Sequence, residues 1–136
     1  MIRRYFKLSP DERRDLYAAA WRLVVVRVLL LFGIRRSVRW LDGFRPQLAA
    51  GADLLLWQRR ADALKRLGAR VPGIACLARA IALRWWMRSA GLDARLLIGV
   101  RPGEGQVASH AWVELDGMPV DDRREHVGGF RVIFTA

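Results

Sequence analysis

The sequence predicts one α+β domain, with helices first and a small antiparallel sheet after them. Apolar residues recur at helical spacing as far as Ser89, and the pattern then changes to the alternation that is typical of strands. Helices followed by strands indicate an α+β fold. The 136 residues fit a single domain, 1–136, and leave no room for a second full core.

The predicted helices are bounded by glycine and proline. Ser9 is placed to cap the first helix, Pro10 suits its first turn and Glu12 completes a capping box. The last helix is apolar on nearly all sides, so we expect it to be the central, buried one, ending at Gly91. The helices are predicted at residues 9–32, 35–41, 53–67 and 74–89, with loops at 43–51 and 71–73.

Four strands are predicted in the rest of the chain. Asp116-Gly117 is a strong signal for a tight hairpin turn between two of them. Pro119 cannot donate to a strand ladder, which indicates an irregular return strand. The strands are predicted at residues 94–101, 110–115, 118–121 and 130–134, with a loop at 102–106.

The chain carries a large excess of positive charge. It has 24 Lys and Arg residues against 13 Asp and Glu, a formal net charge of +11. Such a charge attracts nucleic acid, anionic lipid and acidic proteins without choosing among them. The apolar run at 21–34 is interrupted by Arg22 and Arg27 and is too short to span a bilayer, and no signal-peptide cleavage site follows it. We therefore expect a cytoplasmic protein, with contact to a membrane surface left open.

The single cysteine, Cys76, is the candidate nucleophile. Because there is only one, no intramolecular disulfide can form. Cys76 falls in the first turn of the predicted central helix, where unpaired N–H groups and the helix dipole stabilise negative charge on a sulfur or an oxyanion. The alternative is a buried, inert cysteine, which is common on an apolar helix.

The candidate base is His110, which opens the predicted strand 110–115. Alternation places it on one face with Trp112 and Glu114, while the other face is apolar and suits the core. The His110 face therefore meets either solvent or a site. The second histidine, His126, lies in a polar stretch and is predicted to be a loop residue. One cysteine and two separated histidines give no ligand cluster, so no metal site is predicted.

A catalytic base also needs a group that fixes its tautomer, and the chain after the hairpin offers Asp121 and Asp122. With a two-residue hairpin loop, Trp112 pairs with Asp121, which then shares the His110 face. A three-residue loop or a bulge gives that place to Asp122. The residues alone leave this choice open.

Three stretches of the chain, taken together, resemble one family. They are Cys76-Leu77-Ala78-Arg79-Ala80, Gly91-Leu92-Asp93-Ala94-Arg95, and His110-Ala111-Trp112-Val113-Glu114-Leu115-Asp116-Gly117 with Pro119-Val120-Asp121-Asp122 after it. In order and spacing, residues 53–122 are similar to the transglutaminase-like leader peptidase of lasso-peptide biosynthesis. The long helical N-terminus also suits that family.

The resemblance implies a papain- or transglutaminase-like cysteine peptidase core. This core would span 51–136, with a central helix bearing the cysteine packed on the small antiparallel sheet, and a helical N-terminal region would span 1–50. No metal or organic cofactor is implied.

The resemblance also implies a role for each candidate residue. Cys76 would be the nucleophile, His110 the base and Asp122 the orienting acid, because Asp122 stands two residues after Pro-Val. Asp121 occupies a position where the family more usually has a polar neutral residue. From its place on the His110 face, Trp112 would wall the site, support the histidine or simply pack there.

The implied substrate is the leader region of a ribosomally made precursor peptide, cut where the leader meets the core peptide. The implied partners are a separate leader-binding recognition protein and a lasso cyclase, and no nucleic acid is expected. The basic, apolar N-terminal region suits docking of the leader or of its binding protein. The alternative is that its large apolar residues simply pack on the core; these are Trp21, Val24, Leu31 and Trp40.

Two other functions stay open on the sequence. The same three residues suit a transglutaminase-like acyl transferase or amidase, since a thioester is released by an amine or by water. A basic nucleic-acid-binding module would suit the charge of +11. Against the second, we find neither an aromatic-rich RNA-binding strand nor a helix-turn-helix signature.

Overall fold

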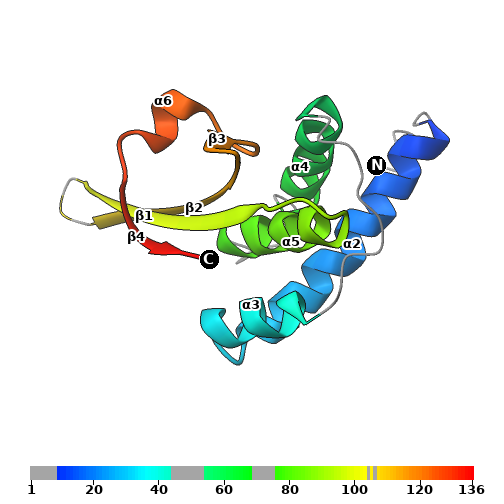
Figure 1. Ribbon diagram of the computed structural model, residues 1–136, viewed down its shortest axis with the longest axis horizontal. Helices are drawn as coiled ribbons and strands as arrows, with labels where there is room; N and C mark the ends of the chain where they lie inside the picture. Colours follow the sequence, from blue (N-terminus) through cyan, green and yellow to red (C-terminus); the bar gives the residue numbers. More distant parts are fainter. Residues whose placement is uncertain (1–8, 44–53, 69–75, 104, 106) are drawn as a thin grey trace.

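The computed structural model describes residues 9–43, 54–68, 76–103, 105 and 107–136 (Figure 1). The predicted loop at 43–51, beyond its first residue, and the predicted turn at 71–73 lie outside them. The helices are α2 (Pro10–Leu30), α3 (Ile34–Asp42), α4 (Leu54–Gly68), α5 (Cys76–Ser89) and α6 (Arg124–Val127). The strands are β1 (Arg95–Pro102), β2 (Val107–Leu115), β3 (Met118–Pro119) and β4 (Arg131–Thr135).

The predicted α+β class is confirmed. The described strands form one sheet of four strands in the order β3-β2-β1-β4, and every neighbouring pair is antiparallel. Two local predictions are wrong. Strand β2 begins at Val107, before the predicted start at His110, and the return strand β3 ends at Pro119 because the chain then bends away from the sheet.

Helix α2, the first of the described helices, begins as predicted and ends slightly early. The Ser9 side chain accepts a hydrogen bond from the backbone N–H of Glu12 at 3.2 Å, which caps α2. The helix ends at Leu30 instead of Phe32. Gly33 has a φ of 103° and connects α2 to α3, a conformation that side-chain-bearing residues rarely adopt.

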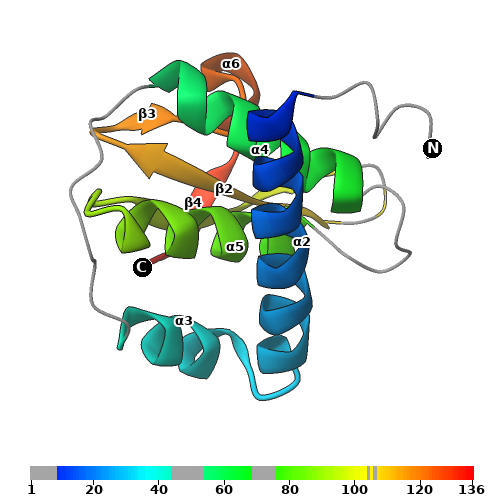
Figure 2. The ribbon, with the colours of Figure 1, turned by 90° about the vertical axis from the view of Figure 1, so that its right-hand side faces the viewer.

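Helix α5 is the central element, as its all-round apolar sequence predicted. It contacts β1 and β2 on one side and α2, α3 and α4 on the others (Figures 1 and 2). Its C-terminus is a Schellman motif: Gly91, with φ 87°, and Leu92 donate backbone hydrogen bonds to Arg88 and Met87, each at 3.0 Å. This packing fixes the position of the N-terminal end of α5, where Cys76 lies.

The N-terminal helix α2 buries one face and exposes another. Ala19, Leu23 and Val26 pack into the core. The idea that the large apolar residues of this region simply pack on the core holds only in part: Trp21 contacts the buried Trp85 of α5 edge-on at a centroid distance of 5.1 Å, but much of each side chain stays exposed. The exposed fractions are 48 % for Trp21, 64 % for Val24, 83 % for Leu31 and 45 % for Trp40. An apolar surface is therefore left on the outer side of α2 and α3.

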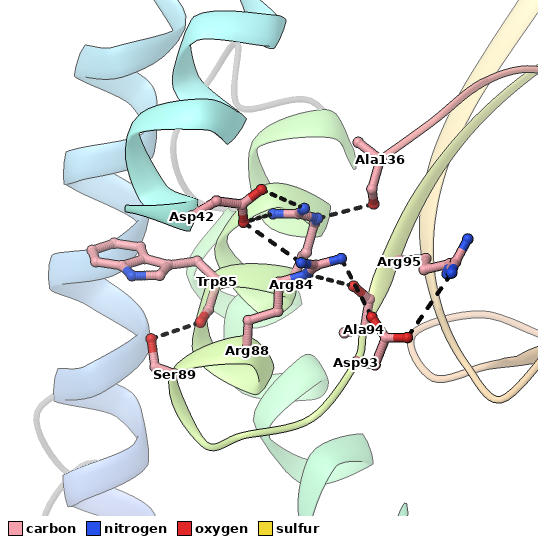
Figure 3. Close-up of polar contacts among 9 residues, drawn as sticks. All are labelled: Asp42, Arg84, Trp85, Arg88, Ser89, Asp93, Ala94, Arg95 and Ala136. Atoms are coloured by element: carbon pink, nitrogen blue, oxygen red, sulfur yellow. Dashed lines mark hydrogen bonds and ion pairs between the residues drawn. The ribbon is translucent and has the colours of Figure 1, made fainter. Parts of the chain in front are cut away.

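Among the described residues, one charged side chain is buried in the core, and its partners could not be predicted from the sequence. Arg84 on α5 is 2 % exposed. Its two terminal nitrogens bind the Asp42 carboxylate at 2.7 and 3.0 Å, and its Nε donates to the backbone oxygen of Ala136 at 3.0 Å (Figure 3). This single guanidinium joins the end of α3, the middle of α5 and the residue after β4.

Within the described segments, no helix combines the length and the apolar character needed to cross a bilayer.

Candidate active site

A pocket of about 210 Å³ opens where the N-terminal end of α5, helix α4, strand β2 and the segment after β3 meet. Polar and ionisable side chains from these four elements and from α6 line it. They are Lys65, Cys76, Arg79, His110, Asp121, Asp122 and His126. Four of the five site residues that the sequence singled out therefore line one pocket, and the fifth, Trp112, does not.

Cys76 is the first residue of α5 and a partly buried free thiol. The first N–H groups of a helix have no partner within the helix, and they carry the positive end of its dipole. A negative charge that forms beside Cys76 is therefore next to donors that are already in place. The expected placement of the thiol in the first turn is what the structure shows.

His110 lies on β2 opposite Gly99 of β1, and its Nε2 is hydrogen-bonded to Oδ2 of Asp122. Among the described residues, its Nδ1 has no hydrogen-bond partner. A neutral imidazole that donates from Nε2 to a carboxylate carries its basic lone pair on Nδ1. The ring is therefore arranged to accept a proton at Nδ1 while Asp122 holds the opposite nitrogen.

The hairpin that precedes the two aspartates has a two-residue loop. Asp116 and Gly117 have φ values of 53° and 79°, as a type I′ turn requires, and the flanking strands pair Leu115 with Met118. On the alternation argument such a loop gives the His110 face to Asp121. That conditional prediction is wrong. Because the chain leaves the sheet after Pro119, the strand alternation no longer applies to either aspartate.

Asp121 turns to the backbone instead. Its Oδ1 accepts a hydrogen bond from the N–H of Val113 at 2.9 Å, where a longer return strand would have offered a carbonyl. Burial raises the pKa of Asp121 to about 6, and the neighbouring Asp122 charge adds to the rise, while the hydrogen bond from Val113 opposes it. Asp121 therefore serves as the hydrogen-bond acceptor for β2 at the point where β3 has ended.

Asp122 is the carboxylate that contacts His110. It also accepts hydrogen bonds from the N–H of Arg123 at 2.7 Å and from Nδ1 of His126, which lies 3.0 Å from both carboxylate oxygens. Burial alone would raise the pKa of Asp122. The hydrogen bonds from His126, Arg123 and His110 outweigh that effect and hold the pKa below its ordinary value. Asp122 is thus kept ionised beside His110.

His126 was predicted to be a loop residue, and that prediction is wrong. It lies on the short helix α6, and its ring centroid is 4.9 Å from that of His110. The expectation that the two histidines are too far apart to share a ligand cluster is also wrong. Ligand atoms of His110, Asp122 and His126 all lie within 4.8 Å of one another. The spacing of four residues between Asp122 and His126 was the one signal in the sequence that could have indicated this.

Two aromatic rings cover the His110 face of β2. Trp112 is 2 % exposed and stacks on His110 at a centroid distance of 5.8 Å. Phe130, which the sequence marked only as the start of a strand, lies 5.4 Å from His110 and 6.2 Å from Trp112. The indole Nε1 of Trp112 donates to Glu114 at 2.9 Å. These contacts hold the imidazole plane, so Trp112 supports the histidine without lining the pocket itself.

A thiol, a basic imidazole nitrogen and an ionised carboxylate in one pocket are the groups that acyl transfer through a thioester requires. The pocket lies at the junction of a helix N-terminus and an antiparallel sheet, and the helix is the central one. The site and the fold are therefore both typical of proteins that transfer acyl groups through a cysteine thioester.

The comparisons agree with this class. A family model described as the transglutaminase-like superfamily matches residues 18–135, from the middle of α2 to the end of β4. Comparison with curated proteins and with solved structures gives no match. The family match extends over most of the chain and includes all the residues that line the pocket. The chain therefore belongs to the transglutaminase-like superfamily.

Proposed function

We propose that this protein is a cysteine peptidase that removes the leader from a ribosomally synthesised precursor peptide during lasso-peptide maturation. One observation carries the proposal: Cys76 lines the same pocket as His110, whose Nε2 is bound by Asp122. The superfamily supports cysteine chemistry in general. The peptide substrate rests on the resemblance of residues 53–122 to leader peptidases.

In the proposed reaction the Cys76 thiol gives its proton to Nδ1 of His110, and the sulfur attacks the carbonyl carbon at the leader–core junction. The oxyanion lies near the backbone N–H of Cys76. His110 then protonates the leaving amine as the C–N bond breaks, which leaves the leader on Cys76 as a thioester. Water attacks this thioester while His110 takes its proton, and the C–S bond breaks to restore the thiol. Asp122 stabilises the imidazolium in both steps.

The alternative is acyl transfer, in which an amine replaces water in the second half of the reaction. The thioester and its three residues are the same in both cases. The products differ, because hydrolysis leaves a free carboxylate and transfer leaves an amide. A mass difference between these products distinguishes them in one experiment.

The groove between α2, α3 and α5 would dock the leader-binding recognition protein. It has a volume of about 780 Å³, and the half-exposed Trp21 and Trp40 lie in its lining. Arg22 lies 4.4 Å from the Trp21 ring and 4.8 Å from that of Trp86. Burial and the charge of Arg60 lower the pKa of Arg22 to about 10, so an incoming carboxylate would be stabilised there. An acidic segment with apolar neighbours fits this lining.

The test is a cleavage assay followed by mass spectrometry, with a lasso precursor peptide and a leader-binding protein sought among the genes that neighbour the gene of this chain. We expect the wild type to release the leader with a free carboxylate. We expect Cys76→Ala to leave the precursor intact, because the nucleophile is gone, while the fold survives so small a change of volume. Circular dichroism of the variant checks that the fold is kept.

Two neighbouring variants provide a matched pair. Asp122→Asn should lower the rate by about 100-fold or more, since it removes the charge that orients His110. Asp121→Asn should cost far less, because its oxygen still accepts from Val113. Cleavage by Cys76→Ala would rule out Cys76 as the nucleophile. A larger loss of rate in Asp121→Asn than in Asp122→Asn would show that Asp121, and not Asp122, orients His110.

A further inference from the structure

The two histidines of this chain converge on one carboxylate, and the proposed peptidase reaction needs only one of them. Nε2 of His110 and Nδ1 of His126 both point at Asp122, the second at 3.0 Å from each oxygen. The other nitrogen of each ring faces away from this carboxylate. The result is a compact set of two imidazole nitrogens and a carboxylate oxygen.

Two imidazole nitrogens and one carboxylate oxygen are donor atoms that bind transition-metal ions in proteins. Zn²⁺ binds His nitrogen and carboxylate oxygen at about 2.0–2.2 Å, which puts neighbouring tetrahedral ligands about 3.3 Å apart. The donors here all lie within 4.8 Å of one another, so shifts of side chains alone would bring them to that spacing. Two nitrogens and one carboxylate favour zinc and its neighbours over Mg²⁺ or Ca²⁺, which prefer oxygen ligands.

The cluster is also accessible. The side chains of His110, Asp122 and His126 are 20 %, 14 % and 43 % exposed, and all three line the pocket that holds Cys76. An ion entering from solvent would meet His126 first. Three protein ligands leave a fourth tetrahedral position for water, as in open zinc sites. Two cations, Lys65 and Arg79, also line the pocket and oppose the ion's charge, while Asp121 favours it.

We propose that His110, Asp122 and His126 bind a divalent transition-metal ion, with Zn²⁺ as the best fit, and that the bound ion reversibly switches off the thiol at Cys76. The binding part of this proposal rests on the cluster alone. The switch rests on the proposed function, since it requires His110 to be the base for Cys76.

The switch follows from the tautomer of His110. A metal on Nε2 requires the proton of the neutral ring to move to Nδ1, which is the nitrogen that has to accept the thiol proton. His126 changes in the opposite sense, from Nδ1–H to Nε2–H. Neutral rings release no proton in this exchange, and an imidazolium releases one to water. Asp122 is also taken from His110, so the base loses both its lone pair and its orienting partner.

Binding is measured by isothermal titration of Zn²⁺ into metal-free protein at pH 7.5. We expect one site in the wild type and in Cys76→Ala, with equal affinity, because the thiol is not a ligand. His126→Gln should weaken binding at least about 10-fold through the loss of one ligand. Glu125→Gln is the matched control, since Glu125 is an exposed acidic residue on the same short helix. It should bind as the wild type does.

The switch is measured by the rate at which iodoacetamide alkylates the protein. Only Cys76 can react, so the rate reports this thiol alone. Saturating Zn²⁺ should slow alkylation of the wild type and of Glu125→Gln at least about 10-fold, and EDTA should restore it. In His126→Gln the same Zn²⁺ concentration should change the rate by less than about 2-fold.

The outcomes separate this proposal from the proposed function. Loss of Zn²⁺ binding in Cys76→Ala would make the thiol a ligand and overturn the assigned site. Equal binding by His126→Gln and the wild type would also overturn it. If Zn²⁺ binds as expected but leaves alkylation unchanged, the metal site stands and the switch fails. Whether the protein is a leader peptidase is tested independently by the cleavage assay in metal-free buffer.

Discussion

At the scale of single residues, Asp121 and Asp122 show how two adjacent carboxylates acquire opposite properties. Asp121 is desolvated and has one backbone donor, and its pKa is raised to about 6. Asp122 is surrounded by donors, and its pKa is lowered. The carboxyl group that is harder to ionise binds the backbone of β2, and the one that is easier to ionise binds His110.

The raised pKa of Asp121 predicts a pH-dependent stability. In the unfolded chain its pKa is about 3.8, so folding takes up a proton between about pH 4 and pH 6. The contribution of Asp121 to stability is therefore full below about pH 4 and is lost as the pH rises through 6. Asp121→Asn removes the cost of the buried charge and keeps the acceptor for Val113. We expect it to be more stable than the wild type at pH 7.5, by up to about 3 kcal/mol.

Urea unfolding of both proteins at pH 7.5 and at pH 4 measures this difference. The gain of Asp121→Asn should shrink towards zero at pH 4, where the aspartate is protonated. A gain of the same size at both pH values would mean that the substitution acts through packing and not through charge.

The sequence indicated which individual residues to consider better than it indicated how they are grouped in space. Cys76 and His110 could be chosen because the chain has one cysteine and one histidine on a strand with an apolar opposite face. The choice between the two aspartates depended on where the chain leaves the sheet, which local alternation does not encode. His126 was missed for a different reason: it lies on a helix of four residues, which is too short to give a recognisable pattern in the sequence.

At the scale of elements, the position of His110 depends on how closely the backbone of β1 approaches the rings of Trp112 and Phe130. Gly99 lies opposite His110 on β1, beneath Trp112 and Phe130. A Cβ on Gly99 would lie 2.7 Å from the Cβ of Phe130 and 3.0 Å from a ring carbon of Trp112. Only glycine therefore allows the two aromatic rings to cover this face of the sheet.

We expect Gly99→Ala to destabilise the fold by about 1–3 kcal/mol through overpacking, and to lower the cleavage rate, since the rings that hold His110 must move. Gly129→Ala is the matched control, because a Cβ there meets its nearest atom at 3.7 Å. Chemical unfolding and the peptide assay measure both effects. Equal stability of the two variants would show that Trp112 and Phe130 adjust without cost.

The order and type of the elements could be read from the sequence, because capping residues, glycines and hydrophobic periods are local signals. Ser9, Gly91 and Asp116-Gly117 each mark a boundary that the structure confirms. The length of β3 could not be read in this way. It depends on the Asp121 carboxylate, which takes the place of a strand carbonyl at Val113.

At the scale of the whole molecule, the buried Arg84 links three separate parts of the fold: α3, α5 and the residue after β4. Its charge is compensated by Asp42, whose side chain is 36 % exposed, while that of Arg84 is 3 % exposed. Removing one member of such a pair leaves an uncompensated buried charge, which costs far more than losing an exposed ion pair.

We expect Asp42→Ala to lower the free energy of unfolding by about 3 kcal/mol, because Arg84 cannot reach water easily. Asp93→Ala is the control, since Asp93 is 74 % exposed and lies 3.6 Å from Arg88. It should cost less than about 1 kcal/mol. Urea unfolding compares the two variants, and similar losses would mean that solvent enters the core and screens Arg84.

The Arg84 contacts have a consequence for how the domain opens. One partner lies 42 residues before Arg84 in the chain and the other lies 52 residues after it. Releasing either partner leaves the guanidinium short of acceptors, so α3 and the segment at Ala136 are coupled although they share few direct contacts. In native-state hydrogen exchange, the amides of α3 and those paired between Leu96 and Ala136 should therefore open together as one cooperative unit.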